Sequence, residues 1–322
     1  MMSIKEIESI AVIGLGTMGP GILQTFAAEG FEVYGYDNDS KAFDTCRKIV
    51  KSNLDTLVEF NRIKKRNAEK ALNRIQYNDS IEKAVQSASL VIECVSENKE
   101  IKKQVYNQIS NYASNDCIIW SNTSTLNVFD LLPIERTPYS VIAHWFAPPH
   151  IIPLVEVVKN SKNIDSTIET TLDLLKKINK IPIILEKYIP GFVINRILRI
   201  LGREAFFLLD NEYISAEDLD LAVKASIAPR MMVLGLVQRY DFTGLDLSAR
   251  NLLDKDFFDP PMDNHPASLH QKLEQGHLGV KSGRGFYDYT DRDLTDILQK
   301  RDRYLLQVIQ SLDFCLEKKR LV

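Results

Sequence analysis

Hydrophobic and polar residues form two different patterns along the chain, and the pattern changes near residue 190. Before that point, short apolar runs typical of buried strands alternate with stretches of helical periodicity. The expected strands cover residues 10–14, 33–37, 90–95, 117–121, 141–146, 154–158 and 181–185, and the expected helices cover 40–60, 68–74, 99–112 and 165–178. Strands that alternate with helices predict a parallel sheet covered on both faces.

One connection departs from this alternation. The apolar segments 141–146 and 154–158 are joined only by residues 147–153, which include three prolines. A connection of this length is too short for the crossover that parallel strands require. We therefore expect residues 141–158 to form a strand pair near an edge of the sheet.

The rest of the chain is predicted to be helical. Residues 191–210 have one apolar face, which consists of Phe192, Ile194, Ile197, Leu198, Leu201, Ala205 and Leu208. A capping-box pattern at 215–218 starts another helix, and further helices are expected at 230–240, 245–253, 266–275 and 293–318, with a glycine-rich loop at 276–289. The pattern predicts an α/β domain over residues 1–188 and an all-α domain over residues 189–322.

The first expected strand leads into a G-x-G-x-x-G turn, and an acidic residue ends the second strand. Such glycines allow a tight turn, a close approach to a pyrophosphate and close packing of the next helix. A carboxylate after the second strand accepts hydrogen bonds from a ribose 2′-OH and repels a 2′-phosphate, which favours NAD over NADP. The predicted NAD-binding residues are Gly14, Gly16, Thr17, Met18, Gly19 and Asp37.

This unit defines the α/β part as a Rossmann-type doubly wound sheet. The alternative is a domain that has the turn for structural reasons and binds no dinucleotide.

Composition and charge further limit the class of protein and its possible partners. Of the 322 residues, 45% are hydrophobic and 26% are charged, which is ordinary for a soluble globular protein. The net charge of −3 gives no general attraction to nucleic acid or to an anionic membrane. The four cysteines lack metal-ligand spacing, and the chain has neither a signal-peptide pattern nor an apolar run of about 18 residues. We expect a cytoplasmic protein without a metal, a membrane or a nucleic-acid partner.

Two residues indicate acid–base chemistry. His144 lies near the end of one expected strand, and Glu156 lies within the apolar run 154–158. A buried carboxylate is costly unless it is paired, and the short connection can bring Glu156 to the imidazole. A carboxylate on one ring nitrogen fixes the tautomer, so the other nitrogen can take a proton from a substrate hydroxyl. The simpler alternative is a core histidine without a catalytic role.

Several motifs in a fixed order carry a family resemblance. They are Gly14–Gly19, Ser121-Asn122-Thr123-Ser124-Thr125, His144-Trp145-Phe146 with Pro153–Val158, Pro190-Gly191-Phe192-Val193-Ile194-Asn195-Arg196 and Lys281–Tyr289. With these motifs the chain resembles the 3-hydroxyacyl-CoA dehydrogenase family over nearly its full length. The resemblance implies an NAD-dependent oxidoreductase and a homodimer formed through the helical domain.

The resemblance also implies roles for individual residues. His144 would be the acid–base, Glu156 would orient it, and Ser124 and Asn195 would hold the reacting oxygen. The further cofactor-site residues that it implies are Glu97, Lys102, Asn122 and Lys281. The plainer alternatives are a helix cap for Ser124, a polar residue of a first helical turn for Asn195 and a surface charge for Lys281.

Some positions depart from the family pattern. Ala147 replaces an asparagine, Trp145 replaces a phenylalanine, and Phe60 stands where the acyl-CoA enzymes have a lysine. These changes, with the proline-rich connection, resemble the branch of L-gulonate 3-dehydrogenase (lambda-crystallin) and carnitine dehydrogenase. The segment Lys281–Tyr289 is more similar to the acyl-CoA branch.

Three functions therefore stay open. The favoured one is NAD-dependent oxidation of an L-3-hydroxyacyl-CoA, in which the basic run 61–70 would contact CoA phosphates. The second is oxidation of a free 3-hydroxy acid, similar to gulonate or carnitine, whose carboxylate would bind Arg196, Arg199 or Arg230. The third is an NAD-binding protein without catalysis.

Overall fold

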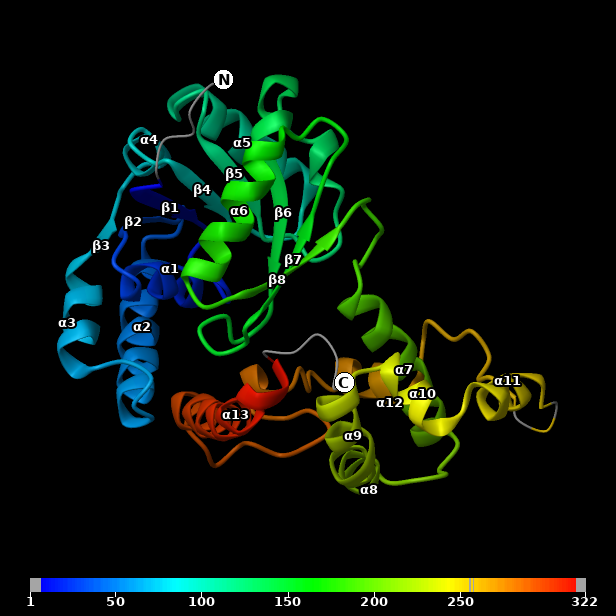
Figure 1. The fold of residues 1–322 in the computed structure, drawn as a ribbon. Coiled ribbons are helices and arrows are strands. Elements are labelled where there is room, and N and C mark those ends of the chain that lie inside the picture. Colours follow the sequence, from blue (N-terminus) through cyan, green and yellow to red (C-terminus); the bar gives the residue numbers. More distant parts are fainter. Residues whose placement is uncertain (1–6, 255, 257, 317–322) are drawn as a thin grey trace. The chain divides into compact units, whose positions relative to one another are not determined.

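The computed structural model describes residues 7–254, 256 and 258–316. The chain divides into two compact units, residues 1–196 and residues 197–322 (Figure 1). The first unit is an α/β structure and the second is helical, which confirms the predicted fold class. The boundary at residue 188 stays a prediction.

One eight-stranded sheet forms the centre of the first unit, with the strand order β3-β2-β1-β4-β5-β6-β7-β8. The strands are β1 (Ser9–Ile13), β2 (Glu32–Tyr36), β3 (Ile75–Tyr77), β4 (Leu90–Glu93), β5 (Ile118–Ser121), β6 (Ser140–Trp145), β7 (Leu154–Val158) and β8 (Ile181–Leu185). Neighbouring strands are parallel except for β6 and β7, which are antiparallel. The predicted strand pair is thus confirmed, and β8 lies outside it at the edge.

The helices of the first unit cover both faces of the sheet. They are α1 (Gly19–Ala28), α2 (Lys41–Glu59), α3 (Lys65–Asn73), α4 (Ile81–Val85), α5 (Lys99–Tyr112) and α6 (Asp165–Lys177). Because strand side chains alternate between faces, Ile10 and Val12 of β1 join the core under α1 and α6, whereas Ala11 and Ile13 join the core under α4 and α5. Figure 1 shows α6 lying across its face of the sheet in front of β5 and β6.

Two short elements were not predicted from the sequence. The edge strand β3 has only three residues, with the polar Gln76 at its centre, and α4 has only five. Neither is long enough to show a period. The helix expected at 68–74 begins earlier, at Lys65. Its first turn is strongly polar and carries no apolar repeat, so the sequence pattern did not indicate it.

The second unit is entirely helical in its described part apart from isolated bridges at 279–288. Its helices are α7 (Ile194–Asp210), which begins in the first unit, α8 (Ala216–Ala222), α9 (Ala228–Leu234), α10 (Gln238–Thr243), α11 (Leu245–Leu253), α12 (Ala267–Glu274) and α13 (Leu294–Leu316). The helix expected at 230–240 is two helices, because Gly235 adopts a φ of 71° between them. The predicted cap before α8 is confirmed, since Ser215 Oγ accepts a hydrogen bond from the Asp218 amide at 3.1 Å.

Candidate active site

The turn between β1 and α1 requires its glycines. Gly14 has a φ of 97°, and a Cβ there would lie 2.7 Å from the carbonyl carbon of Cys94. A Cβ at Gly19 would lie 2.1 Å from the carbonyl oxygen of Gly14. At Gly16, by contrast, an added Cβ would have nothing within 4 Å. This open approach beside a helix N-terminus is what a pyrophosphate needs, so the residues present fit a dinucleotide.

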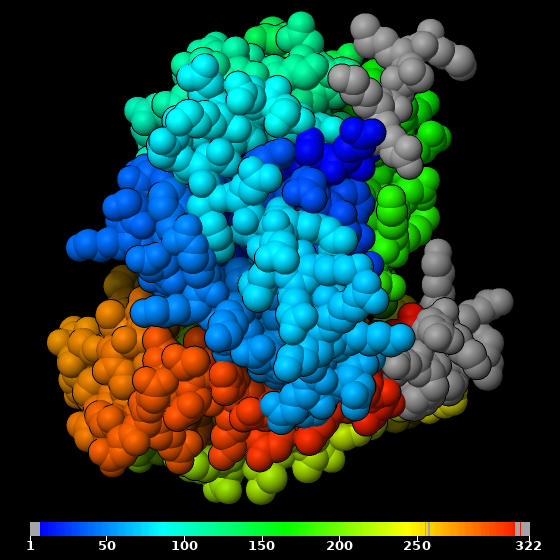
Figure 2. Space-filling model, turned by 90° about the vertical axis from the view of Figure 1, so that its left-hand side faces the viewer, coloured from blue at the N-terminus to red at the C-terminus, as the bar shows by residue number. Residues whose placement is uncertain are grey.

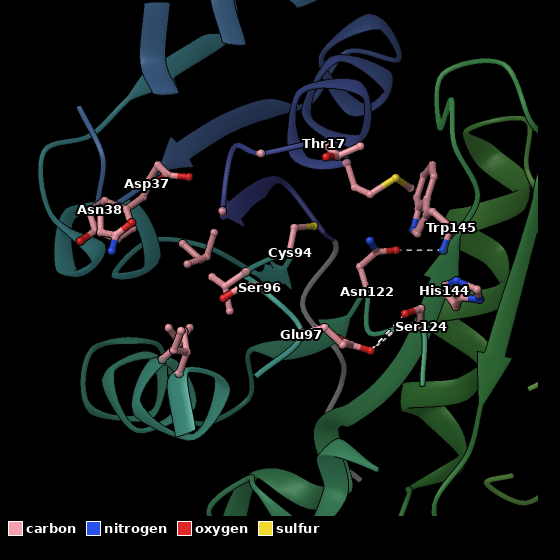
Figure 3. A pocket seen from close by; sticks show the side chains of 18 of the residues that line it. Thr17, Asp37, Asn38, Cys94, Ser96, Glu97, Asn122, Ser124, His144 and Trp145 are labelled. Carbon is pink, nitrogen blue, oxygen red and sulfur yellow. Dashed lines mark hydrogen bonds between the residues drawn. The ribbon is translucent and has the colours of Figure 1, made fainter. Parts of the chain in front are cut away.

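Asp37 closes one end of the same site. Its Oδ2 accepts a hydrogen bond from the Leu15 amide at 2.7 Å, and its Oδ1 accepts one from the Asp39 amide at 2.9 Å. Asp37 lines a cavity of about 990 Å³, and so do Thr17 and Met18 of the turn. Figure 3 shows Asp37 at one end of this cavity and the segment that carries His144 at the other.

The second feature of the cavity is a buried histidine–carboxylate pair. His144 and Glu156 face each other across the antiparallel strands β6 and β7, and the distance from His144 Nδ1 to Glu156 Oε2 is 2.8 Å. Glu156 is fully buried. Its other oxygen, Oε1, accepts hydrogen bonds from the amides of Val193 at 2.9 Å and Ile194 at 3.0 Å, where α7 begins. Glu156 therefore orients His144 and stabilises the start of α7 at the same time.

Aromatic rings enclose the imidazole of His144. The ring centroid of Phe146 lies 4.5 Å from that of His144, and the centroid of Phe192 lies 5.3 Å from it. The prediction that Phe192 belongs to the apolar face of the following helix is wrong. Gly191 and Phe192 both have positive φ, 77° and 50°, so the helix begins only at Ile194, and the Phe192 ring is buried in the first unit.

The loop after β5 is organised by Glu97. Its Oε1 accepts hydrogen bonds from Thr123 Oγ1 at 2.7 Å and from the amide and hydroxyl of Ser124 at 2.9 and 3.1 Å. Burial acts to raise the pKa of Glu97, but the Thr123 hydrogen bond, the charge of Lys102 and the loop amides outweigh burial and lower that pKa to about 2. Asn195 Nδ2 donates to the Ser124 carbonyl at 3.4 Å. Ser124 and Asn195 thus lie together at the cavity, as the resemblance implies.

A buried polar cluster lies below this loop, and the sequence analysis missed it. Glu93 accepts hydrogen bonds from Lys102 Nζ at 2.7 Å, from the Tyr106 hydroxyl at 2.6 Å and from Ser121 Oγ at 2.7 Å. Lys102 is 1% exposed and approaches Glu97 at 3.4 Å, so it supports the loop and does not line the cavity. The missed signal is the acidic Glu93 at the end of an apolar strand, which is the signal that identified Glu156.

The two remaining residues predicted for the cofactor site, Asn122 and Lys281, lie in different units of the chain. Asn122 lines the cavity, and its Oδ1 accepts a hydrogen bond from the Trp145 amide at 2.9 Å. Lys281 lies in a short 3-10 helix, Val280–Ser282, of the second unit. Its role at the cofactor stays a prediction.

Two features of the described residues bear on metal binding and on membranes. They contain no group of three or more His, Cys, Asp or Glu side chains that could hold a metal ion. Among these same residues, no helix is both long and apolar enough to cross a membrane. The cytoplasmic location stays a prediction.

A dinucleotide turn beside a buried histidine–carboxylate pair is typical of an NAD-dependent oxidoreductase that acts on CH–OH groups. The family model for the NAD-binding domain of 3-hydroxyacyl-CoA dehydrogenase matches residues 9–188, and the model for the C-terminal domain matches residues 191–289. The chain belongs to the 3-hydroxyacyl-CoA dehydrogenase family. This finding confirms the resemblance, the NAD cofactor and the enzyme class, so the alternative without catalysis is set aside.

Two relatives match most of this chain. A 5-formyl-3-hydroxy-2-methylpyridine 4-carboxylate 5-dehydrogenase from Mesorhizobium japonicum is 34% identical over 95% of this chain and 99% of its own. A 3-hydroxybutyryl-CoA dehydrogenase from Clostridioides difficile is 34% identical over 87% of this chain and 99% of its own.

Solved structures of the same two kinds of enzyme resemble the chain. A crystal structure of the pyridine carboxylate dehydrogenase, described as an NAD+-dependent dismutase, has a TM-score of 0.85 and 33% identity and covers 96% of this chain and 99% of its own. The (S)-3-hydroxybutyryl-CoA dehydrogenase from Ralstonia eutropha has a TM-score of 0.69 and 31% identity, and it covers 88% of this chain and 99% of its own.

Proposed function

We propose that this enzyme moves a hydride between NAD and a carbon bearing a hydroxyl group, with His144 as the acid–base. The observation that carries the proposal is the 2.8 Å contact between His144 Nδ1 and the buried Glu156 carboxylate. Glu156 keeps the proton on Nδ1, so Nε2 takes the proton of the substrate hydroxyl. Ser124 and Asn195 lie where they can hold the reacting oxygen. NAD, when bound at the glycine turn, accepts the hydride.

We propose a free carboxylate-bearing compound, and not a CoA thioester, as the substrate. The TM-score to the pyridine carboxylate dehydrogenase, 0.85, exceeds the 0.69 to the 3-hydroxybutyryl-CoA dehydrogenase. Phe60 at the end of α2 also replaces the lysine that the resemblance associates with CoA. Of the arginines proposed for a carboxylate, Arg196 directly follows Asn195 and is exposed, and within the described part of the chain its guanidinium donates only one long hydrogen bond, of 3.5 Å, to the Pro190 carbonyl.

The test is a comparison of three carbonyl substrates in NADH oxidation at 340 nm. They are acetoacetyl-CoA, free acetoacetate and an aromatic ring with neighbouring formyl and carboxylate groups. We expect turnover of a free carboxylate to exceed that of the thioester, and we expect Arg196→Leu to raise its KM. A strong preference for acetoacetyl-CoA would refute the free substrate, and full activity of His144→Ala would refute the reaction itself.

A CoA thioester is the second candidate, and one surface feature favours it. All four basic residues in the turn between α2 and the first residues of α3, from residue 62 to residue 66, are exposed. They lie on the α2–α3 side of the first unit, which faces the viewer in Figure 2 in shades of blue and cyan. If they bind CoA phosphates, Lys64→Glu with Lys65→Glu and Arg66→Glu would raise the KM for acetoacetyl-CoA and leave that for acetoacetate unchanged.

We also propose a homodimer formed through the second unit. Among its described residues, only Pro266, Asp302 and Leu306 are buried. Large apolar side chains such as Leu252 and Leu253 are 89% and 80% exposed. So much apolar surface is typical of an interface. Light scattering coupled to gel filtration should give twice the chain mass, and a monomer at micromolar concentration would contradict the proposal.

A further inference from the structure

Lys180, between α6 and β8, is a buried lysine that the reaction described above does not use. It is 7% exposed, and no carboxylate among the described residues forms an ion pair with it. Its ammonium donates hydrogen bonds to the carbonyl oxygens of Pro149 at 2.6 Å and Ile152 at 2.9 Å. The same ammonium lies 5.1 Å from the centroid of the Trp145 ring. Burial lowers the pKa of Lys180 to about 7. Burial of a lysine without a carboxylate partner costs folding free energy. We therefore expect Lys180 to have a role.

The three groups that Lys180 contacts belong to one hairpin. Trp145 ends β6, and Pro149 and Ile152 lie in the turn 147–153 that leads to β7. This turn therefore connects His144 with Glu156. The Ile151 and Ile152 amides both donate to the Pro148 carbonyl at 3.0 Å, so the turn is closed on itself and Lys180 holds it from outside.

The other side of this hairpin rests on α1, the helix of the dinucleotide turn. A Cβ at Gly21 would lie 2.6 Å from Pro149 Cγ, which shows how closely the turn packs on that helix. The Trp145 ring lies 6.0 Å from that of Phe26 in α1. The hairpin is thus held between the helix that starts the cofactor site and the ammonium of Lys180.

From this geometry we infer that Lys180 is a positioning residue, whose ammonium holds the 145–152 segment so that His144 and Phe146 keep their place in the cavity wall. Trp145 and Phe146 line that cavity, and the Phe146 ring packs against His144 at an interplanar angle of 56°. Two carbonyl oxygens and an aromatic face can stabilise a buried ammonium where no carboxylate is present. Removal of the ammonium leaves two carbonyls without a donor, and the wall relaxes. The inference rests on the proposed role of His144.

The test combines kinetics with fluorescence in the full-length enzyme with NAD. Lys180→Met is compared with Lys177→Met, a matched control in which an exposed ammonium lies 5.0 Å from the Phe31 ring. We expect Lys180→Met to lower kcat about ten- to a hundredfold, because small misplacements of an acid–base are costly. The KM for NAD should stay within about twofold, since the glycine turn is untouched. Lys180→Gln, which keeps a donor for the carbonyls, should recover part of kcat.

Fluorescence tests the contact without any turnover. The chain has two tryptophans, so Trp120→Phe leaves Trp145 as the single reporter. In that background Lys180→Met should shift the emission maximum and Lys177→Met should not. A folded Lys180→Met enzyme with the kcat of the control, or an unchanged Trp145 emission, would overturn the inference. If Lys180→Met does not fold, the same two comparisons with Lys180→Gln decide. Failure of the proposed function would show differently, as undiminished turnover in His144→Ala.

Discussion

Replacement of Glu156 by glutamine tests how the structure fixes the acid–base. The substitution removes a charge and keeps the shape of the side chain. Glu156 Oε1 accepts two amide hydrogens, from Val193 and Ile194, at 2.9 and 3.0 Å. A glutamine must point its carbonyl oxygen at these donors, because the flipped amide would place NH2 against two N–H groups. Losing both hydrogen bonds costs about 2–3 kcal/mol, so the flipped form is about a hundredfold rarer.

The favoured orientation reverses the tautomer of His144. The amide NH2 of the glutamine then faces Nδ1, which must accept a hydrogen bond and therefore carries no proton. The proton lies on Nε2, which can no longer take one from the substrate. In serine proteases, the corresponding Asp→Asn change also gives the histidine the wrong tautomer, and it lowers kcat about 10⁴-fold. We expect kcat for oxidation to fall about 10³- to 10⁴-fold, or about 4–5.5 kcal/mol in barrier height.

The assay is steady-state NADH formation at 340 nm, with NAD affinity and thermal unfolding measured on the same samples. NAD affinity should stay the same, because Glu156 is not among the described residues that line the cavity, and Asp37 lies at the end of the cavity opposite His144 (Figure 3). Glu169→Gln, an exposed change on α6, is the matched control. If Glu156→Gln kept kcat within about tenfold of the control, the tautomer argument would be wrong.

Three further predictions concern stability and cofactor choice. Lys102→Met leaves the buried Glu93 charge unpaired and should lower the free energy of unfolding in urea by about 3–5 kcal/mol; a loss below about 1 kcal/mol would contradict it. Burial lowers the pKa of Lys180 from its ordinary value of 10.5 to about 7 in the folded protein, so the unfolded chain binds more protons between these two pH values. The stability difference between wild type and Lys180→Met should therefore change in favour of wild type as pH rises from 7 to 10, and a flat difference would count against it. Asp37→Asn removes the charge that repels a 2′-phosphate, so the NAD:NADP ratio of kcat/KM should fall about tenfold or more; an unchanged ratio would rule this out.

The sequence predicted the β-sheet and the histidine pair for identifiable reasons. The glycine turn and the acid at its proper distance are local signals, and Glu156 stands out as a charge within an apolar strand. The short connection 147–153 then allows only a hairpin, which brings Glu156 opposite His144. Each of these steps depends on neighbours in the sequence or on a single short turn.

Contacts between distant segments could not be predicted in the same way. Helical periodicity continues smoothly through Phe192, and only its φ of 50° shows that the helix starts later. The second role of Glu156 depends on that late start, because it turns the Val193 and Ile194 amides toward the carboxylate. No sequence pattern indicated that Lys180 is buried, since a lysine in a short connection between a helix and a strand is normally exposed.

Two fully buried glutamates of this enzyme, Glu93 and Glu156, are stabilised in different ways, and the difference bears on catalysis. Glu93 has a permanent counter-ion, since Lys102 lies 2.7 Å away. Among the residues that the structure describes, Glu156 forms no ion pair with a lysine or arginine; it accepts hydrogen bonds from two backbone amides at the positive end of the α7 dipole and contacts the His144 ring. In the proposed reaction His144 takes the substrate proton, and the imidazolium then becomes the counter-ion that Glu156 otherwise lacks. The attraction thus grows as the reaction proceeds, and an interaction that is stronger in the transition state than in the ground state is what accelerates a reaction.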